Sequence, residues 1–194
     1  MSLIKKVRAV EKVYYSLEKQ ISAFQQKSNF KCIENCHFCC TKHDIQANPL
    51  EFLPLAYYLY KNQQAYNFLE RLEQSSHQTV CVLFNPFSND GACSFYNYRG
   101  LICRLFGFSA MLDKHENKTL ITCKLLKTQK STEFKIAQQL INNGADVPLT
   151  SKYYLKLYAI DLKLSAQYYS INDAIKQAIE TVLFYFSYRD KKVS

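Results

Sequence analysis

The sequence contains few of the residues that make a chain repetitive or flexible. Only four glycines and four prolines occur among its 194 residues, a composition that argues against collagen, low-complexity segments and rigid linkers. No stretch approaches the roughly 18 apolar residues of a membrane span. Charges near the start also interrupt the apolar run that a signal peptide requires. We therefore expect a cytoplasmic protein without a membrane partner.

Motifs of the common enzyme classes are also missing. The chain has no Gly-rich phosphate-binding loop, no Ser/His/Asp arrangement and no pair of carboxylates in a suitable context. Its hydrophobic content of 48% and charged content of 21% are those of a folded globular protein. A chain of this length buries about 70% of its unfolded surface, so it does not need a metal merely to fold. Enzymatic activity stays an open question at this point.

The formal net charge of +9 raises the question of nucleic-acid binding. The lysines and arginines are scattered along the predicted helices, and there is no arginine-rich arm. Cysteine thiolates around two divalent ions would also lower the net charge to about +5. A basic module that binds nucleic acid or protein is therefore an alternative function, with nucleic acid the less favoured partner.

Cysteine, in contrast, is abundant and clustered. Four of the eight cysteines fall within nine residues, and the other four follow along the chain. The candidate ligands are Cys32, Cys36, Cys39, Cys40, Cys81, Cys93, Cys103 and Cys123. Thiols this dense repel one another as thiolates and oxidise when exposed, so they usually bind a metal ion or an iron-sulfur cluster, or form disulfides. In a reducing cytoplasm, metal ligands are favoured over disulfides.

The spacing within the first cluster has two implications. On a helix the four cysteines would share one face, so a buried apolar stripe is an alternative to a metal site. We favour the metal site, because leucine or alanine would fill such a stripe without the redox liability. Cys39 and Cys40 are adjacent and would close a strained ring on one ion, which suggests that they serve two different ions.

Other polar groups lie near these cysteines. His37 and His43 are close enough in sequence to act as ligands, although most histidines beside such a cluster are surface groups or outer-sphere partners. Arg99 and Arg104 flank Cys103 and are expected to donate N–H groups to thiolates, offsetting the negative charge of the site.

The rest of the pattern predicts an α+β fold, mostly helical, with a small cysteine-rich metal-binding core of short strands and loops. Apolar residues at helical spacing indicate an amphipathic helix over 3–26. Asn48 and Glu51 form a capping box at the start of another helix. Segments 105–112 and 119–122 are expected to pair. Further helices are expected over 62–76, 133–142 and 150–168, and from residue 171 onward.

The cysteines and histidines all lie before residue 128, which suggests two parts. We expect a cysteine-cluster metal-binding domain with an N-terminal helix over 1–127. A helical C-terminal extension over 128–194 would follow it.

Three stretches resemble the YkgJ-like cysteine-cluster family, whose proposed role is the chelation of zinc or iron. Its pattern is C-x-x-C-x-x-C-C, then a C-x-x-L segment, then C-x-x-Y-x-x-R-P-x-x-C-R-x-F. Residues 36–40 match the end of the first motif, 81–84 resemble the second, and 93–106 match the third. Cys123 stands where a later family cysteine is often found. The resemblance covers about residues 30–125.

The chain departs from the family pattern at two places. Three residues instead of two separate Cys32 from Cys36, which weakens the assignment of Cys32 as a ligand. Gly100 replaces the proline that follows Arg99, and it is expected to loosen that turn.

The resemblance implies a metal held by cysteine thiolates. Two closed tetrahedral zinc sites would use eight sulfurs, so we expect one or two zinc ions in a structural role. Iron, or a [4Fe-4S] cluster on four of the cysteines, is the alternative. An iron-sulfur redox enzyme, which could modify lysines of proteins, is the corresponding alternative function. A protein partner is possible, and the catalytic residues are unknown.

Overall fold

The computed structural model describes residues 1–33, 36–74, 80–87 and 93–190. Its longer helices are α1 (Leu3–Ser28), α2 (Leu53–Lys61), α3 (Ala65–Gln74), α6 (Ser131–Asn142), α7 (Thr150–Ile160) and α9 (Ile171–Asp190). Shorter helices are η1 (Pro49–Phe52), η2 (Tyr96–Tyr98), α4 (Leu101–Leu105), α5 (Lys124–Gln129) and α8 (Leu162–Ser165). The strands are β1 (Gln46–Ala47), β2 (Ser109–Leu112), β3 (Lys118–Ile121) and β4 (Tyr169–Ser170). The expected α+β, mostly helical class is confirmed.

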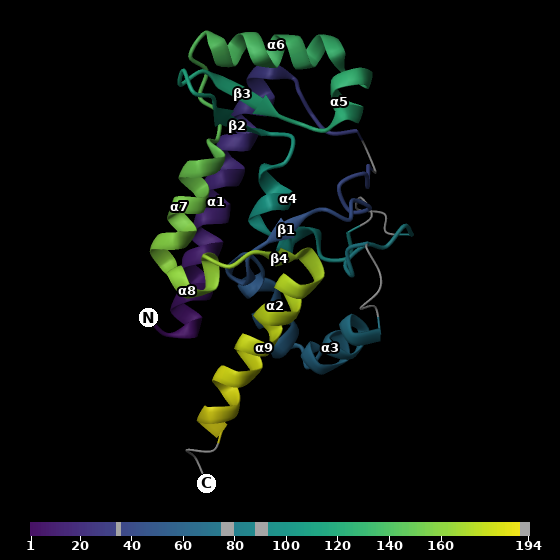
Figure 1. Cartoon of the computed structure of the whole chain (residues 1–194), viewed down its shortest axis with the longest axis vertical. Coiled ribbons are helices and arrows are strands. Elements are labelled where there is room, and N and C mark those ends of the chain that lie inside the picture. Colours follow the sequence, from purple (N-terminus) through teal and green to yellow (C-terminus); the bar gives the residue numbers. More distant parts are fainter. Residues whose placement is uncertain (34–35, 75–79, 88–92, 191–194) are drawn as a thin grey trace.

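Helix α1 runs along the length of the molecule (Figure 1). Ser2 caps its start by accepting a hydrogen bond from the Lys5 backbone N–H. It ends at Asn29, which has a left-handed backbone with φ of 52°, a conformation that asparagine adopts more readily than most residues. The buried stripe from Leu3 to Phe24 confirms the amphipathic helix predicted over 3–26.

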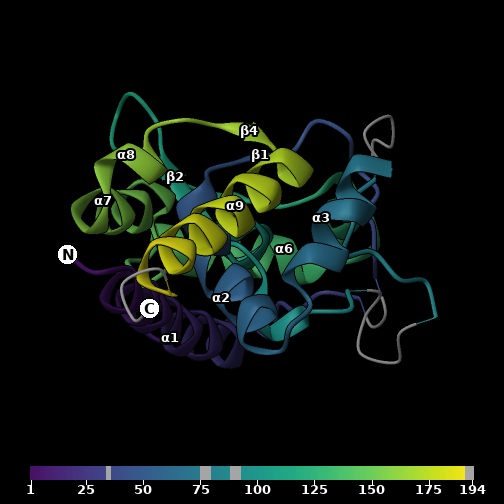
Figure 2. The ribbon, with the colours of Figure 1, turned by 90° about the horizontal axis from the view of Figure 1, so that it is seen from below.

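The larger hydrophobic core lies among the helices at the lower end of Figure 1. Helix α9 packs across α2, as seen from below in Figure 2. Strand β1 pairs antiparallel with β4, which joins the segment before α2 to the segment before α9. The predicted capping box is present, because the Asn48 and Glu51 side chains each accept a hydrogen bond from the other residue's backbone N–H.

A smaller core lies in the hairpin lobe, residues 106–149, at the opposite end of α1 (Figure 1). Strands β2 and β3 form the expected antiparallel pair, with Ser109 opposite Ile121. The Gln138 side chain of α6 fastens this hairpin, because it donates to the Lys118 carbonyl and accepts from the Leu120 N–H. Helix α6 therefore covers the hairpin and makes it a separate lobe.

The prediction of one helix over 150–168 is wrong. Helix α7 ends at Ile160, and Asp161 has an extended backbone with φ of −156°. Its carboxylate accepts the Leu164 N–H at 3.1 Å, forms an ion pair with Lys6, and starts α8. An aspartate that can cap a new helix competes with continuation of the old one.

The division at residue 127/128 stays a prediction. Residues on both sides of it share the two hydrophobic cores, since Phe24 and Ile141 belong to the smaller core, and Leu55 and Ile179 to the larger one. Within the described parts of the chain, no helix has the length and apolar character needed to cross a membrane.

Gly100 precedes α4 with φ of −62°, a value open to most residues. Glycine is required there because of limited space: an added Cβ would lie 2.7 Å from Cζ of the fully buried Phe52. We expect Gly100→Ala to lower the free energy of unfolding by about 1–3 kcal/mol, the usual cost of overpacking. A proline there would meet the same ring.

A double-mutant cycle tests this packing. Phe52→Leu removes the ring tip that an alanine at position 100 would meet, so the two substitutions together should cost less than the sum of their separate effects. Urea unfolding of the four proteins gives the coupling energy. Strict additivity would show that Phe52 does not restrict position 100.

Candidate metal centre

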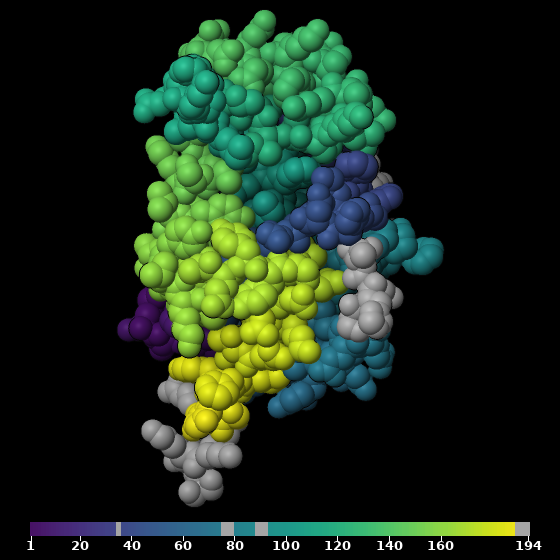
Figure 3. All heavy atoms as spheres, in the orientation of Figure 1, coloured from purple at the N-terminus to yellow at the C-terminus, as the bar shows by residue number. Residues whose placement is uncertain are grey.

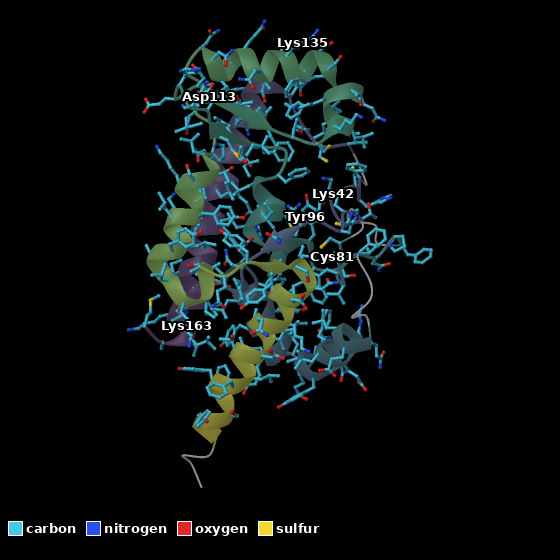
Figure 4. The ribbon with its side chains drawn as sticks, in the orientation of Figure 1. Lys42, Cys81, Tyr96, Asp113, Lys135 and Lys163 are labelled. Atoms are coloured by element: carbon cyan, nitrogen blue, oxygen red, sulfur yellow. The ribbon has the colours of Figure 1, made fainter. Side chains whose placement is uncertain are left out.

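The cysteines come from separate segments that meet on one side of the molecule. The described residues of 31–45 lie at the edge of the molecule, between the hairpin lobe and the lower helices (Figure 3). The turns around Cys81 and Tyr96 lie beside them, at the middle of the same side (Figure 4). Residues 38–41 form a turn, and no described residue of 31–45 is helical, so the helical stripe considered for the four clustered cysteines does not form.

Six cysteines line one small pocket, which we call the thiol pocket. They are Cys36, Cys39, Cys40, Cys81, Cys93 and Cys103. The volume of the pocket is about 50 Å³, which is room for a few water-sized groups. Phe52 and Leu83 contribute apolar walls. Cysteines from three segments that are far apart in the sequence, 36–40, 81 and 93–103, therefore line one largely enclosed pocket.

Backbone hydrogen bonds hold three of these cysteines in place. The Cys81 N–H donates to the Cys40 carbonyl at 3.3 Å, which joins the first cluster to the 80–84 turn. Phe84 and Cys93 form an antiparallel bridge, and the Ser94 N–H donates to the Leu83 carbonyl at 2.9 Å. This short bridge is the strand-like part of the core that the sequence predicted between these cysteines.

Asn172, near the start of α9, fixes the Cys81 turn from both sides. Its Oδ1 accepts the Val82 N–H at 2.8 Å, and its Nδ2 donates to the Val80 carbonyl at 3.0 Å. One side chain thus satisfies the backbone on either side of a buried cysteine. Sequence reasoning missed this role, since the contact joins residues 90 or more positions apart and leaves no local signal.

Glu51 performs the same task for α4, which carries Cys103. Its Oε1 accepts from the Asn48 backbone N–H at 3.0 Å, and its Oε2 accepts the Ile102 N–H at 2.7 Å. Burial raises the pKa of this carboxyl from its ordinary 4.5 to about 7. The capping-box residue found in the sequence is therefore also the group that anchors the helix bearing Cys103.

This raised pKa predicts a pH dependence of stability. The folded chain holds a proton on Glu51 at pH values where the unfolded chain has lost it, so the contribution of Glu51 to stability falls as pH rises from about 4.5 to 7. Relative to Glu51→Gln, the wild type should lose roughly 2 kcal/mol between pH 5 and pH 8. Urea unfolding of both proteins measures this difference. Parallel pH curves would contradict it, since every other titrating group is common to both.

Most of the thiols are poor acids in this setting. Burial raises the pKa of Cys81 to about 12. Cys32 is exposed at the surface, but partial desolvation and the neighbouring thiols Cys36 and Cys39 raise its pKa to about 11. Burial also raises the pKa of Cys103. Cys39 is the exception, because a hydrogen bond from the Cys40 thiol lowers its pKa to about 6, aided by the charge of Arg99. A bound cation would therefore have to displace protons from several cysteines.

The two arginines beside Cys103 have different roles. Arg99 lines the thiol pocket, and its charge opposes the rise in pKa that burial causes at Cys93 and Cys103. Arg104 makes its hydrogen bonds elsewhere, to the carbonyls of Arg99 and Asn97, and forms an ion pair with Glu18. The expected charge compensation fits Arg99, whereas Arg104 secures the turn that precedes α4.

The remaining candidates lie outside the thiol pocket. Cys32 is exposed, and Cys123 is buried in the hairpin lobe, where its Sγ caps α5 by accepting the Leu126 N–H at 3.3 Å. His37 contacts the Phe84 ring, and His43 is exposed; neither lines the pocket. Six of the eight cysteines predicted as ligands thus line the thiol pocket, whereas Cys32 and Cys123 line only the larger cavity beside it.

The donor set suits a thiophilic metal. Six sulfurs line the pocket, and none of its described lining residues carries a carboxylate or an imidazole. Such thiolate sets are the ligands that zinc and iron-sulfur centres favour. Among the residues that the structure describes, no three cysteine, histidine, aspartate or glutamate side chains are already grouped as ligands of one ion. The cysteines share a pocket, and rotation about their Cα–Cβ bonds would be needed for their sulfurs to converge on one centre.

Comparison with known protein families identifies the family to which the chain belongs. The sequence model of the CxxCxxCC family, described as "Putative zinc- or iron-chelating domain", matches residues 31–139. That range contains all eight cysteines and more than half of the chain. No curated protein matches the chain, and no solved structure does. The chain belongs to the CxxCxxCC family of zinc- or iron-chelating domains.

Proposed function

We propose that the protein chelates zinc or iron through the thiolates of the thiol pocket, and that the metal is structural. One observation carries the proposal: six cysteines from three separate chain segments line a single pocket of about 50 Å³. Closed tetrahedral sites of this type use four sulfurs at about 2.3 Å. Six sulfurs could therefore hold one ion, or two ions that share bridging thiolates.

The surroundings of the pocket support a structural role. Asn172 and the Cys40 carbonyl hold the Cys81 turn, a bridge to Phe84 holds Cys93, and Glu51 anchors the short helix α4 that carries Cys103. Segments with so little regular hydrogen bonding gain order when an ion joins them, because the free energy of metal binding adds to that of folding. Arg99 would reduce the negative charge that several thiolates on one ion create.

Two cysteines are left out of this metal site. Cys32 precedes the extra residue that departs from the family spacing, and Cys123 caps a helix in the hairpin lobe. The adjacent pair Cys39 and Cys40 both line the pocket, which agrees with two ions as well as with one. A [4Fe-4S] centre, redox or lysine-modifying activity, a protein or nucleic-acid partner and a cytoplasmic location stay predictions.

Metal analysis tests the proposal. The full chain is purified without oxygen and without chelating resin, and its metals are counted by mass spectrometry beside a visible spectrum. We expect about one or two zinc ions per chain and no colour, or iron with absorption near 400 nm if the centre is an iron-sulfur cluster. A chain that carries no transition metal, and takes up neither zinc nor iron when it is supplied, would refute the proposal.

A further inference from the structure

A second, much larger cavity adjoins the thiol pocket, and we call it the cleft. Its volume is about 550 Å³, within the range of about 300–1,000 Å³ typical of small-molecule sites. Cys36, Cys39 and Cys103 line both cavities, and Cys32 and Cys123 line the cleft alone. The cleft lies between α1, the 31–45 segment and the hairpin lobe, so an occupant would lie directly against the sulfurs.

One wall of the cleft is apolar. Phe106, Phe108 and Leu126 form it from the hairpin lobe, and Phe38 adds a ring that is 40% exposed. Such a wall favours a ligand with an apolar body, since covering it removes hydrophobic surface from water. Helix α1 contributes the polar side chains of Glu18, Ser22 and Gln25 to the lining, together with Ile21.

Arg99 and Arg104 are the cationic residues among the described lining of the cleft. Of the two, Arg99 has guanidinium N–H groups that are not already hydrogen-bonded to any described residue. Arg104 is buried and directs its guanidinium to Glu18 and two backbone carbonyls. Arg99 stacks on Tyr96, with its Cζ 3.5 Å from the ring centroid, and its Nε donates to the Tyr96 carbonyl. Within the described parts of the chain, its Nη1 and Nη2 donate to no acceptor. The stacking fixes the plane of the guanidinium and leaves this edge for a ligand.

We propose that the cleft binds a small organic carboxylate, with its carboxylate paired to Arg99 and its apolar body against Phe106, Phe108 and Leu126. A guanidinium edge presents two N–H groups that match the two oxygens of a carboxylate. A phosphate dianion fits less well, because one uncommitted guanidinium beside a cluster of thiols offers little positive charge. The inference goes beyond the proposed metal site and holds whichever metal is bound.

Calorimetry on the full chain as purified tests the proposal with naphthylacetate and its neutral analogue naphthylacetamide. The two share one aromatic body and differ in the charged group. We expect naphthylacetate to bind at one site per chain, at least about tenfold more tightly than the amide, as befits a charge-assisted pair. Equal affinity of the two probes, or no binding of naphthylacetate, would overturn the proposal.

Variants locate the site. Arg99→Gln should weaken naphthylacetate binding at least about tenfold and leave the amide unaffected. Lys156→Gln is the matched control, since it also removes one cation stacked on a tyrosine, with Nζ 4.2 Å from the Tyr153 ring, but on α7 outside the cleft. Ser22→Phe fills part of the cleft from an exposed position of α1 and should weaken both probes. Unchanged binding in Arg99→Gln or in Ser22→Phe would overturn the assignment.

The metal content of the same samples separates this inference from the proposed function. If metal-loaded wild type binds the two probes equally, the proposed carboxylate site in the cleft is refuted and the metal site is not. Wild type that takes up neither zinc nor iron when they are supplied, and still prefers naphthylacetate, would refute the metal site alone. If Arg99→Gln fails to fold, the comparison of the two probes on wild type and on Ser22→Phe still decides the question.

Discussion

Cys103→Ser is expected to remove metal from the thiol pocket and to destabilise the protein. Cys103 lines both cavities and lies on α4, which Glu51 anchors at the Ile102 N–H. The backbone therefore cannot shift easily to bring another donor to the same place. A serine hydroxyl is a poor ligand for a thiophilic metal. We expect a loss on the order of 100-fold in metal affinity, which corresponds to about 2.7 kcal/mol of unfolding free energy at saturating metal.

Cys123→Ser is the matched control for this substitution. The Cys123 Sγ accepts the Leu126 N–H at the start of α5, and serine is a favoured residue at such a cap. Metal content should stay at the wild-type level, and stability should change by less than about 1 kcal/mol. Metal analysis and urea unfolding of the two variants give the comparison. Equal metal loading of wild type and Cys103→Ser, or equal losses in both variants, would contradict the ligand assignment.

Removal of the metal by a chelator is expected to have the second large effect. An ion present at about 1,000 times its dissociation constant contributes about 4 kcal/mol to stability. For a chain of this size, that corresponds to a fall in Tm of roughly 8–16 °C. Thermal unfolding before and after chelation, and again after zinc is restored, measures the effect. An unchanged Tm in metal-free protein would show that the ion does not stabilise the fold.

Removal of the metal should loosen only the cysteine-bearing segments and leave the rest of the fold ordered. The described residues of 31–45 form no helix and make few backbone hydrogen bonds, whereas α1 and α2 are packed in the larger core. Trypsin should therefore cut metal-free protein faster after Lys31 and Lys42, both of which are accessible. Cleavage sites within α1, such as Lys12, should stay protected at the same rate. Equal acceleration at all sites would indicate global unfolding instead.

Local patterns in the sequence predicted the regular elements well. The amphipathic period gave α1, the Asn48 and Glu51 pair gave the capping box, and the 105–112 and 119–122 segments contain the paired strands β2 and β3. Each of these depends on residues close together in the chain. The break at Asp161 was missed, since the apolar spacing continues through it and the cap becomes evident only from its contacts with Leu164 and Lys6.

The candidate site was predicted only in part. Cysteine density and the family motifs identified the ligand candidates, but they could not show that Cys32 and Cys123 lie outside the thiol pocket. The roles of Asn172 and of Glu51 toward the cysteine turns come from contacts between distant segments. The cleft likewise exists only because α1 and the hairpin lobe face the cysteine segment across space. Patterns within a single sequence do not show which distant segments come into contact in the fold.

X-ray absorption at the edge of the bound metal tests the central claim most directly. Chelation by the thiol pocket predicts a first shell made of sulfur, at about 2.3 Å for zinc, with the sulfur signal reduced in Cys103→Ser and unchanged in Cys123→Ser. A first shell of nitrogen and oxygen, or a sulfur shell that persists in Cys103→Ser, would contradict the account.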